Sequence, residues 1–153
     1  MPEIVVVFDV DGTLTPFRKG STGPFERRLL PNVAEKCASL RAQGHILALA
    51  SNQGGARRSK PGRLTIGQVH AHLRWVAREI GAASYRFAIS GDRKKPSPRM
   101  LVELMRELGA DPTSTLFVGD AESDAQAAAA AGVRFAWARE FFKSGLRLYA
   151  ISR

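Results

Sequence analysis

Ile4-Val5-Val6-Val7-Phe8-Asp9-Val10-Asp11-Gly12-Thr13-Leu14-Thr15 is the stretch that decides the fold of this chain. Its run of apolar, mostly β-branched residues is typical of a strand buried on both faces, as in the centre of a parallel sheet. Asp9 and Asp11 follow two residues apart, a spacing that puts both carboxylates on one face of an extended chain. Gly12 then permits the sharp turn that leaves them in the crevice above the sheet, where open α/β folds bind ligands.

Two neighbouring carboxylates cost free energy unless a cation neutralises them or one of them is protonated. We therefore interpret Asp9 and Asp11 as a catalytic or metal-binding pair. The alternative is an Asx-type turn that merely follows a core strand. A calcium loop is disfavoured, because the EF-hand pattern has its glycine at the sixth position and here it is at the fourth.

Composition limits the remaining possibilities. A length of 153 residues fits one domain, 1–153, with a sizeable core. No apolar run approaches the ~20 residues of a membrane span and no signal peptide precedes Ile4, so we expect no membrane partner. Cys37 is the only cysteine; this excludes a disulfide framework and indicates a reducing, cytoplasmic location. The net charge of +9 favours an anionic ligand.

Strand and helix patterns alternate along the chain. Further strands are predicted at 45–50, 85–89, 115–118 and 133–138, and helices at 31–43, 65–80, 98–108, 125–131 and after 139. This alternation predicts an α/β fold, a three-layer Rossmann-like parallel sheet of about five strands with helices on both faces. Cys37 is interpreted as a core residue. His70 and His72, which have no partner at metal-ligand spacing, are interpreted as solvated surface histidines.

Polar side chains recur where the other predicted strands end. Ser51 opens a glycine-rich turn after the second strand; such a turn can bind phosphate, although an ordinary turn is the better interpretation of it alone. Lys94 and Lys95 follow the third strand. Asp120 and Asp124 follow the fourth, four residues apart across a helix start, and can face one point. Because parallel strands end at one edge of the sheet, the pattern predicts an active site there.

With these residues in place, the sequence resembles the haloacid dehalogenase-like superfamily of phosphotransferases from residue 4 to about 138. The four motifs that carry the resemblance are Asp9-Val10-Asp11-Gly12-Thr13, Ser51, Lys95, and Gly119-Asp120 with Asp124. Ser51-Asn52-Gln53 and Lys95-Pro96-Ser97-Pro98 are similar to the histidinol-phosphate and heptose-bisphosphate phosphatase branch, and the first also resembles polynucleotide 3′-phosphatases. Serine replaces the usual threonine of that branch, and the zinc-binding Cys/His loop of some heptose-bisphosphate phosphatases is absent.

The resemblance implies a role for each residue. Asp9 would be the nucleophile that forms an aspartyl-phosphate, and Asp11 the general acid and base. The residues expected to bind the substrate are Ser51, Asn52, Arg57, Arg58 and Lys95, with Ser51 and Lys95 also acting in catalysis and Lys94 as the alternative lysine. The expected Mg²⁺ ligands are Asp9, the carbonyl of Asp11, Asp120 and Asp124.

The spacing of these motifs predicts a domain without a cap. Only 39 residues separate Asp11 from Ser51, and 43 separate Ser51 from Lys95. After a loop, a helix and a strand, neither gap can hold a folded cap of ~60 residues. We therefore expect an open site, covered at most by neighbouring loops or by another subunit; the sequence does not indicate an oligomeric state.

The loops after the first three strands carry ten basic residues. They are Arg18, Lys19, Arg57, Arg58, Lys60, Arg63, Arg93, Lys94, Lys95 and Arg99. An open site surrounded by cations can admit a polyphosphorylated metabolite or the end of a nucleic acid strand. Because few aromatic residues are available to stack on bases, we favour a small phosphorylated metabolite as substrate. The alternatives are the 3′-phosphorylated end of a nucleic acid, for which only Phe17 and Phe25 offer base stacking, and a phosphate-binding module without turnover.

Overall fold

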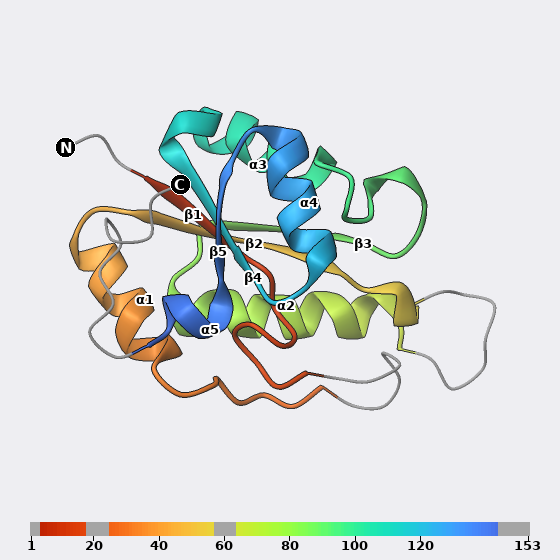
Figure 1. Ribbon diagram of the computed structural model, residues 1–153. Coiled ribbons are helices and arrows are strands. Elements are labelled where there is room, and N and C mark those ends of the chain that lie inside the picture. The colour runs from red at the N-terminus through yellow and green to blue at the C-terminus, as the bar shows by residue number, and fades with distance from the viewer. Residues whose placement is uncertain (1–3, 18–24, 57–63, 144–153) are drawn as a thin grey trace.

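The computed structural model describes residues 4–17, 25–56 and 64–143, which form a five-stranded sheet with helices on both sides (Figure 1). The strands are β1 (Val5–Phe8), β2 (Ile46–Asn52), β3 (Ser84–Ala88), β4 (Thr115–Gly119) and β5 (Arg134–Trp137). The helices are α1 (Val33–Ala42), α2 (Ile66–Ile80), α3 (Arg99–Leu108), α4 (Glu122–Ala131) and α5 (Ala138–Phe141). All strand pairs are parallel in the order β3-β2-β1-β4-β5, so β1 is central.

The sheet separates two apolar cores, which confirms the three-layer α/β prediction. Alternate residues of β1 face opposite sides: Val6 and Phe8 pack with α1, α2 and α5, whereas Val5 and Val7 pack with α3 and α4. All four are buried, as the apolar run predicted. Cys37 lies fully buried in the first of these cores, as expected.

The chain order places the site. Successive strands are added on one side of β1 up to β3, after which the chain crosses to β4 and β5 on the other side (Figure 1). The loop after β1 leads to α1 on one face of the sheet and the loop after the neighbouring β4 leads to α4 on the other face, so these two loops diverge at the carboxyl edge, which is where open α/β folds bind ligands. In the described parts of the chain, the segment between Asp11 and Lys95 contains only elements of the domain itself, and no cap is evident.

Helix α2 shows how local sequence sets the geometry of the site. Its first turn has a capping box: Thr65 N donates to Gln68 Oε1 (2.8 Å) and Gln68 N to Thr65 Oγ1 (3.1 Å). Gly81, in the left-handed conformation, ends the helix. The buried stripe consists of Val69, His72, Leu73, Val76 and Ile80. The interpretation of His72 as a solvated histidine is therefore wrong.

Two boundaries differ from the predictions in ways that affect the site. Strand β2 extends to Asn52 because Ser51 and Asn52 pair with β3, so both lie at the end of a strand and not in a turn. Helix α4 begins at Glu122, three residues earlier than predicted, so Asp124 lies in its first turn. None of the helices in the described ranges is long and apolar enough to cross a membrane.

Candidate active site

Asp9 stands at the end of β1, in a turn whose shape depends on Gly12. Its backbone N–H still donates to Val118 O (2.9 Å) of β4, while the Val10 carbonyl accepts the N–H groups of the following turn. Gly12 has φ 91°, which few L side chains adopt. A Cβ at Gly12 would also collide with the carboxylate of Asp120. The glycine thus allows the β1 turn to approach the β4 loop closely.

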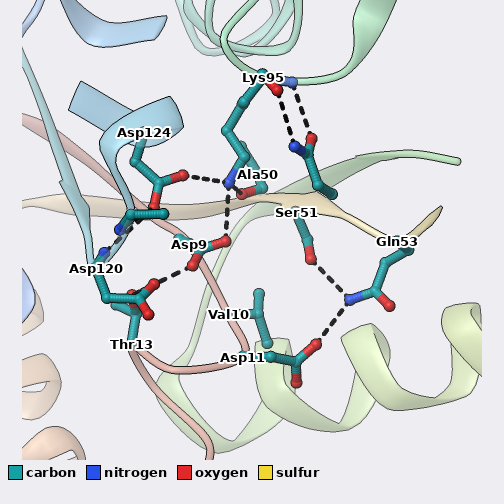
Figure 2. A network of polar contacts seen from close by, with 12 residues as sticks. Asp9, Val10, Asp11, Thr13, Ala50, Ser51, Gln53, Lys95, Asp120 and Asp124 are labelled. Carbon is teal, nitrogen blue, oxygen red and sulfur yellow. Dashed lines mark hydrogen bonds and ion pairs between the residues drawn. The ribbon is translucent and has the colours of Figure 1, made fainter. Parts of the chain in front are cut away.

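Lys95 crosses the site and binds two carboxylates at once (Figure 2). Its Nζ lies 2.8 Å from Asp9 Oδ1 and 2.6 Å from Asp124 Oδ1, and it donates to the Ala50 carbonyl at 2.9 Å. The Nζ of Lys94 lies instead beside Gly54. The geometry therefore favours Lys95 over Lys94 as the lysine that reaches the reacting groups.

The electrostatics of this cluster leave it short of positive charge. Burial raises the pKa of Asp9 to about 6, although the Lys95 ammonium opposes the shift. Burial and the neighbouring Asp9 charge likewise raise the pKa of Asp124. Burial alone would lower the pKa of Lys95, but the charges of Asp9 and Asp124 outweigh it and hold this pKa above its usual value. One ammonium thus serves two buried acids, and a further cation would be bound favourably.

A third acid completes a set that could hold such a cation. One carboxylate oxygen from each of Asp9, Asp120 and Asp124 lies within 4.8 Å of the others. Thr13 Oγ1 is within hydrogen-bond distance of Asp9 Oδ2 (3.4 Å) and Asp120 Oδ1 (3.2 Å). Three hard oxygen donors on two adjacent strand ends fit Mg²⁺, which prefers oxygen ligands.

Asp124 is held by the backbone at the start of α4. Its Oδ2 accepts the N–H groups of Asp120 (3.2 Å) and Ala121 (3.1 Å), which leaves Oδ1 directed at Lys95. Gly119 is required at the end of β4, because a Cβ there would overlap the Asp124 side chain. The glycine of the fourth motif therefore makes room for its second acid.

Asp11 has a different environment from Asp9. Its Oδ1 accepts hydrogen bonds from Thr15 Oγ1 (3.0 Å) and lies 3.1 Å from His72 Nε2. Its Oδ2 accepts a bond from Gln53 Nε2 (2.9 Å), whose amide also donates to Ser51 Oγ (2.8 Å) (Figure 2). Gln53 therefore links the serine of β2 to the second aspartate of β1.

The structure brings most of the predicted site residues together around one cavity of about 190 Å³. They are Asp9, Asp11, Ser51, Asn52, Lys95, Asp120 and Asp124. The amide of Asn52 is engaged by the backbone of Lys95, accepting from its N–H (2.9 Å) and donating to its carbonyl (3.0 Å). Asn52 thus fixes the lysine loop. Arg57 and Arg58 lie outside the described residues.

A larger cavity of about 520 Å³ adjoins this one on the β5 side. It shares Asp120 and is lined in addition by Thr13, Trp137, Arg139 and Phe142, among others. Neither Asp9 nor Lys95 reaches it. The smaller cavity, which contains the paired acids and the lysine, is therefore the candidate active site.

Three residues of the site were not assigned a role from sequence. Gln53 and Thr13 stand inside the quoted motifs, so the resemblance itself could have drawn attention to them. For His72 the signal was its position: three residues after Val69 and four before Val76, it belongs to the buried stripe of α2.

Comparison with known proteins agrees with this site. Residues 24–132 match the family of haloacid dehalogenase-like hydrolases. The chain is 27% identical over 143 residues to D-glycero-beta-D-manno-heptose-1,7-bisphosphate 7-phosphatase from Rhodopseudomonas palustris, covering 82% of this chain and 77% of that protein. It is 38% identical over 107 residues to phosphoglycolate phosphatase from Pseudomonas putida, covering 68% of this chain. The chain spans only about a third (34%) of that second relative.

A solved structure shows the same fold. The D,D-heptose 1.7-bisphosphate phosphatase from B. bronchiseptica, crystallised with magnesium and phosphate, superposes with a TM-score of 0.75. The match covers 86% of this chain and 78% of that one at 23% identity. At this identity the likeness concerns the arrangement of the sheet and helices.

Proposed function

The chain belongs to the haloacid dehalogenase-like hydrolase family and is a phosphatase. From that premise we propose that it cleaves phosphomonoesters of small metabolites. We further propose that the reaction proceeds through an aspartyl-phosphate on Asp9, with Mg²⁺ as cofactor. The observation that carries the proposal is the position of Asp9. It lies at the end of the central strand, within 2.8 Å of the Lys95 ammonium and inside the three-acid set. A carboxylate so placed can attack phosphorus while neighbouring charges are offset.

In the first half-reaction an oxygen of Asp9 forms a bond to phosphorus as the bond from phosphorus to the leaving oxygen breaks. Asp11 gives its proton to that oxygen, so the product leaves as an alcohol and Asp11 becomes a carboxylate. Ser51 and Lys95, which line the same cavity, would hold the transferring phosphoryl group.

In the second half-reaction water attacks phosphorus and Asp11 takes up its proton. The bond between phosphorus and Asp9 breaks, which releases inorganic phosphate and restores the free Asp9 carboxylate. Mg²⁺ held by Asp9, Asp120 and Asp124, and by the Asp11 carbonyl, would offset the negative charge of the phosphoryl oxygens.

Two observations support a small metabolite as the substrate. The match to the heptose-bisphosphate relative extends over most of both chains, and the substrate in the name of that relative is a sugar bisphosphate. In addition, Phe25, one of two aromatic residues considered for base stacking, is stacked on His72 and so occupied within the domain. A zinc loop built on cysteines is excluded because Cys37, the only cysteine, is buried on the inner face of α1. We therefore propose a small sugar phosphate or bisphosphate as the substrate class.

The test is a release assay for inorganic phosphate with a defined set of substrates. The set contains a heptose or hexose bisphosphate, a sugar monophosphate, phosphoglycolate and a 3′-phosphorylated oligonucleotide, each with Mg²⁺ or with EDTA. Asp9→Asn is the inactive control. We expect Mg²⁺-dependent release from a sugar phosphate and none from the Asp9→Asn variant.

Each contrary result has a distinct meaning. Activity of the Asp9→Asn variant would overturn the assignment of the nucleophile. Efficient and salt-sensitive release from the oligonucleotide alone would replace the metabolite with a nucleic-acid end. Binding of phosphate without hydrolysis of any ester in the set would indicate that the protein is a phosphate-binding module.

A further inference from the structure

His72 is a buried polar residue that the reaction described above does not use. Its side chain is fully buried in α2, and its ring is stacked on Phe25 with centroids 3.9 Å apart and planes at 8°. Nε2 lies 3.1 Å from Asp11 Oδ1. Nδ1 has no hydrogen-bond partner among the described residues.

These contacts decide which ring nitrogen carries the proton. A proton on Nδ1 would be a buried N–H group without an acceptor, which costs on the order of 1–3 kcal/mol. A proton on Nε2, in contrast, is donated to the Asp11 carboxylate. A ring with a single proton therefore carries it on Nε2, and His72 acts as a hydrogen-bond donor to Asp11.

The donors around Asp11 also distinguish its two oxygens. Oδ1 accepts from both Thr15 and His72, whereas Gln53 donates to Oδ2. A carboxylate oxygen with two donors on it has little capacity left for a proton of its own. The proton that Asp11 exchanges with the leaving group is accordingly carried by Oδ2.

We propose that His72 is a positioning residue for the general acid: it fixes the Asp11 carboxyl so that Oδ2 presents its proton to the leaving group. This inference rests on the proposed function, in which Asp11 is the acid. Phe25 contributes by holding the imidazole ring in one plane, and the helical register of α2 aims the ring at the β1 turn. Orientation of this kind is what makes a general acid effective.

The proposal predicts a dependence on the leaving group. An alkoxide is a poor leaving group and needs the proton of Asp11, whereas p-nitrophenolate leaves as a stable anion. In a covalent mechanism kcat/KM reports only the steps up to formation of the aspartyl-phosphate, so it isolates this proton transfer. A structural defect, by contrast, would lower kcat/KM for both kinds of substrate.

The experiment compares His72→Leu with the native protein on p-nitrophenyl phosphate and on the sugar phosphate cleaved fastest in the substrate set. We expect kcat/KM for the sugar phosphate to fall about 10–100-fold, within the range that general acids contribute. For p-nitrophenyl phosphate we expect less than about a threefold fall. His72→Gln, whose amide N–H can reach the place of Nε2, should restore most of the activity.

His70→Leu is the matched control. His70 lies on the same helix but bonds to the Tyr85 hydroxyl (2.8 Å), away from Asp11, so both substrates should keep their kcat/KM. If His72→Leu does not fold, His72→Asn replaces it. The side chains of His72→Asn and His72→Gln are both polar amides, but that of His72→Asn is too short to reach Asp11. An equal fall for both substrates, or no fall for either, would overturn the proposal.

Asp11→Asn separates this inference from the proposed function. If Asp11→Asn keeps its kcat/KM for the sugar phosphate, Asp11 is not the acid and the proposed mechanism fails. If Asp11→Asn loses that activity but the His72 variants do not discriminate between leaving groups, only the role of His72 is refuted.

Discussion

Replacing Asp9 by Asn should stabilise the metal-free protein at neutral pH while abolishing catalysis. Burial raises the pKa of Asp9 from 3.8 to about 6, against the opposing charge of Lys95. Each pH unit of such a shift corresponds to about 1.4 kcal/mol, so keeping Asp9 ionised in the folded state costs about 3 kcal/mol of stability. Asparagine has nearly the same shape and carries no charge, so it removes this cost.

The sign of the effect fixes its pH dependence. The folded state binds the Asp9 proton more tightly than the unfolded state, so the stabilisation from this proton is complete below pH 3.8 and lost as pH rises through about 6. The native protein therefore loses up to about 3 kcal/mol over that interval, and the Asn variant does not. Asp124 and Lys95 are present in both proteins, but the Asp9 charge raises the pKa of each, so the difference reports on the three coupled groups together.

The assays are urea unfolding and thermal unfolding in EDTA, each followed by tryptophan fluorescence at about pH 4 and about pH 8. For a domain of this size, about 3 kcal/mol corresponds to a rise in Tm of about 6–12 °C for Asp9→Asn at the higher pH. The control is Asp92→Asn, which removes an exposed acid whose ion-pair partner among the described residues is Arg99, also exposed, and should change little. If Asp9→Asn is no more stable than the native protein at about pH 8, the assigned electrostatic cost is wrong.

Three further substitutions test other parts of the site. Lys95→Met leaves two buried carboxylates without their cation and should lower the free energy of unfolding by about 3–5 kcal/mol in EDTA, with partial recovery in Mg²⁺; an unchanged urea midpoint would contradict this. Asp120→Ala should keep the fold but lose most of the rise in Tm that Mg²⁺ gives the native protein. An equal rise in the variant and the native protein would show that the metal site has been assigned to the wrong residues. Gly119→Ala should displace Asp124 and reduce kcat at least about tenfold with the circular dichroism spectrum retained. Gly67→Ala, where a Cβ meets nothing closer than 3.8 Å, is its control and should leave kcat unchanged.

The fold could be predicted from sequence because its signals are local. The apolar run before Asp9 indicated a central strand, and the helix predicted at 65–80 agrees with α2 (Ile66–Ile80) within one residue. The end of β2 was missed for a non-local reason. Ser51 and Asn52 are polar, and only their pairing with β3 makes them part of the strand.

The same distinction explains what was found and missed in the site. Asp9, Asp11, Asp120 and Asp124 could be grouped because topology alone brings the ends of parallel strands together. His72 was missed because its polarity suggested solvent, while its partner, Asp11, lies 61 residues away in the chain. Its place on the apolar stripe of α2 was the observation that should have outweighed its polarity.

The two aspartates that follow β1 are two residues apart, yet their neighbours differ in kind, and this difference supports the separate roles proposed for them. Asp9 contacts the Lys95 ammonium and two further acids, an arrangement that stabilises an ionised nucleophile once a metal ion joins it. Asp11 is held by a hydroxyl, an amide and an imidazole, and none of these needs a fixed charge on its partner. A group that must give up a proton and regain it in each turnover is better held by donors such as a hydroxyl and an amide than by a lysine ammonium, because a fixed charge would favour one of its two protonation states.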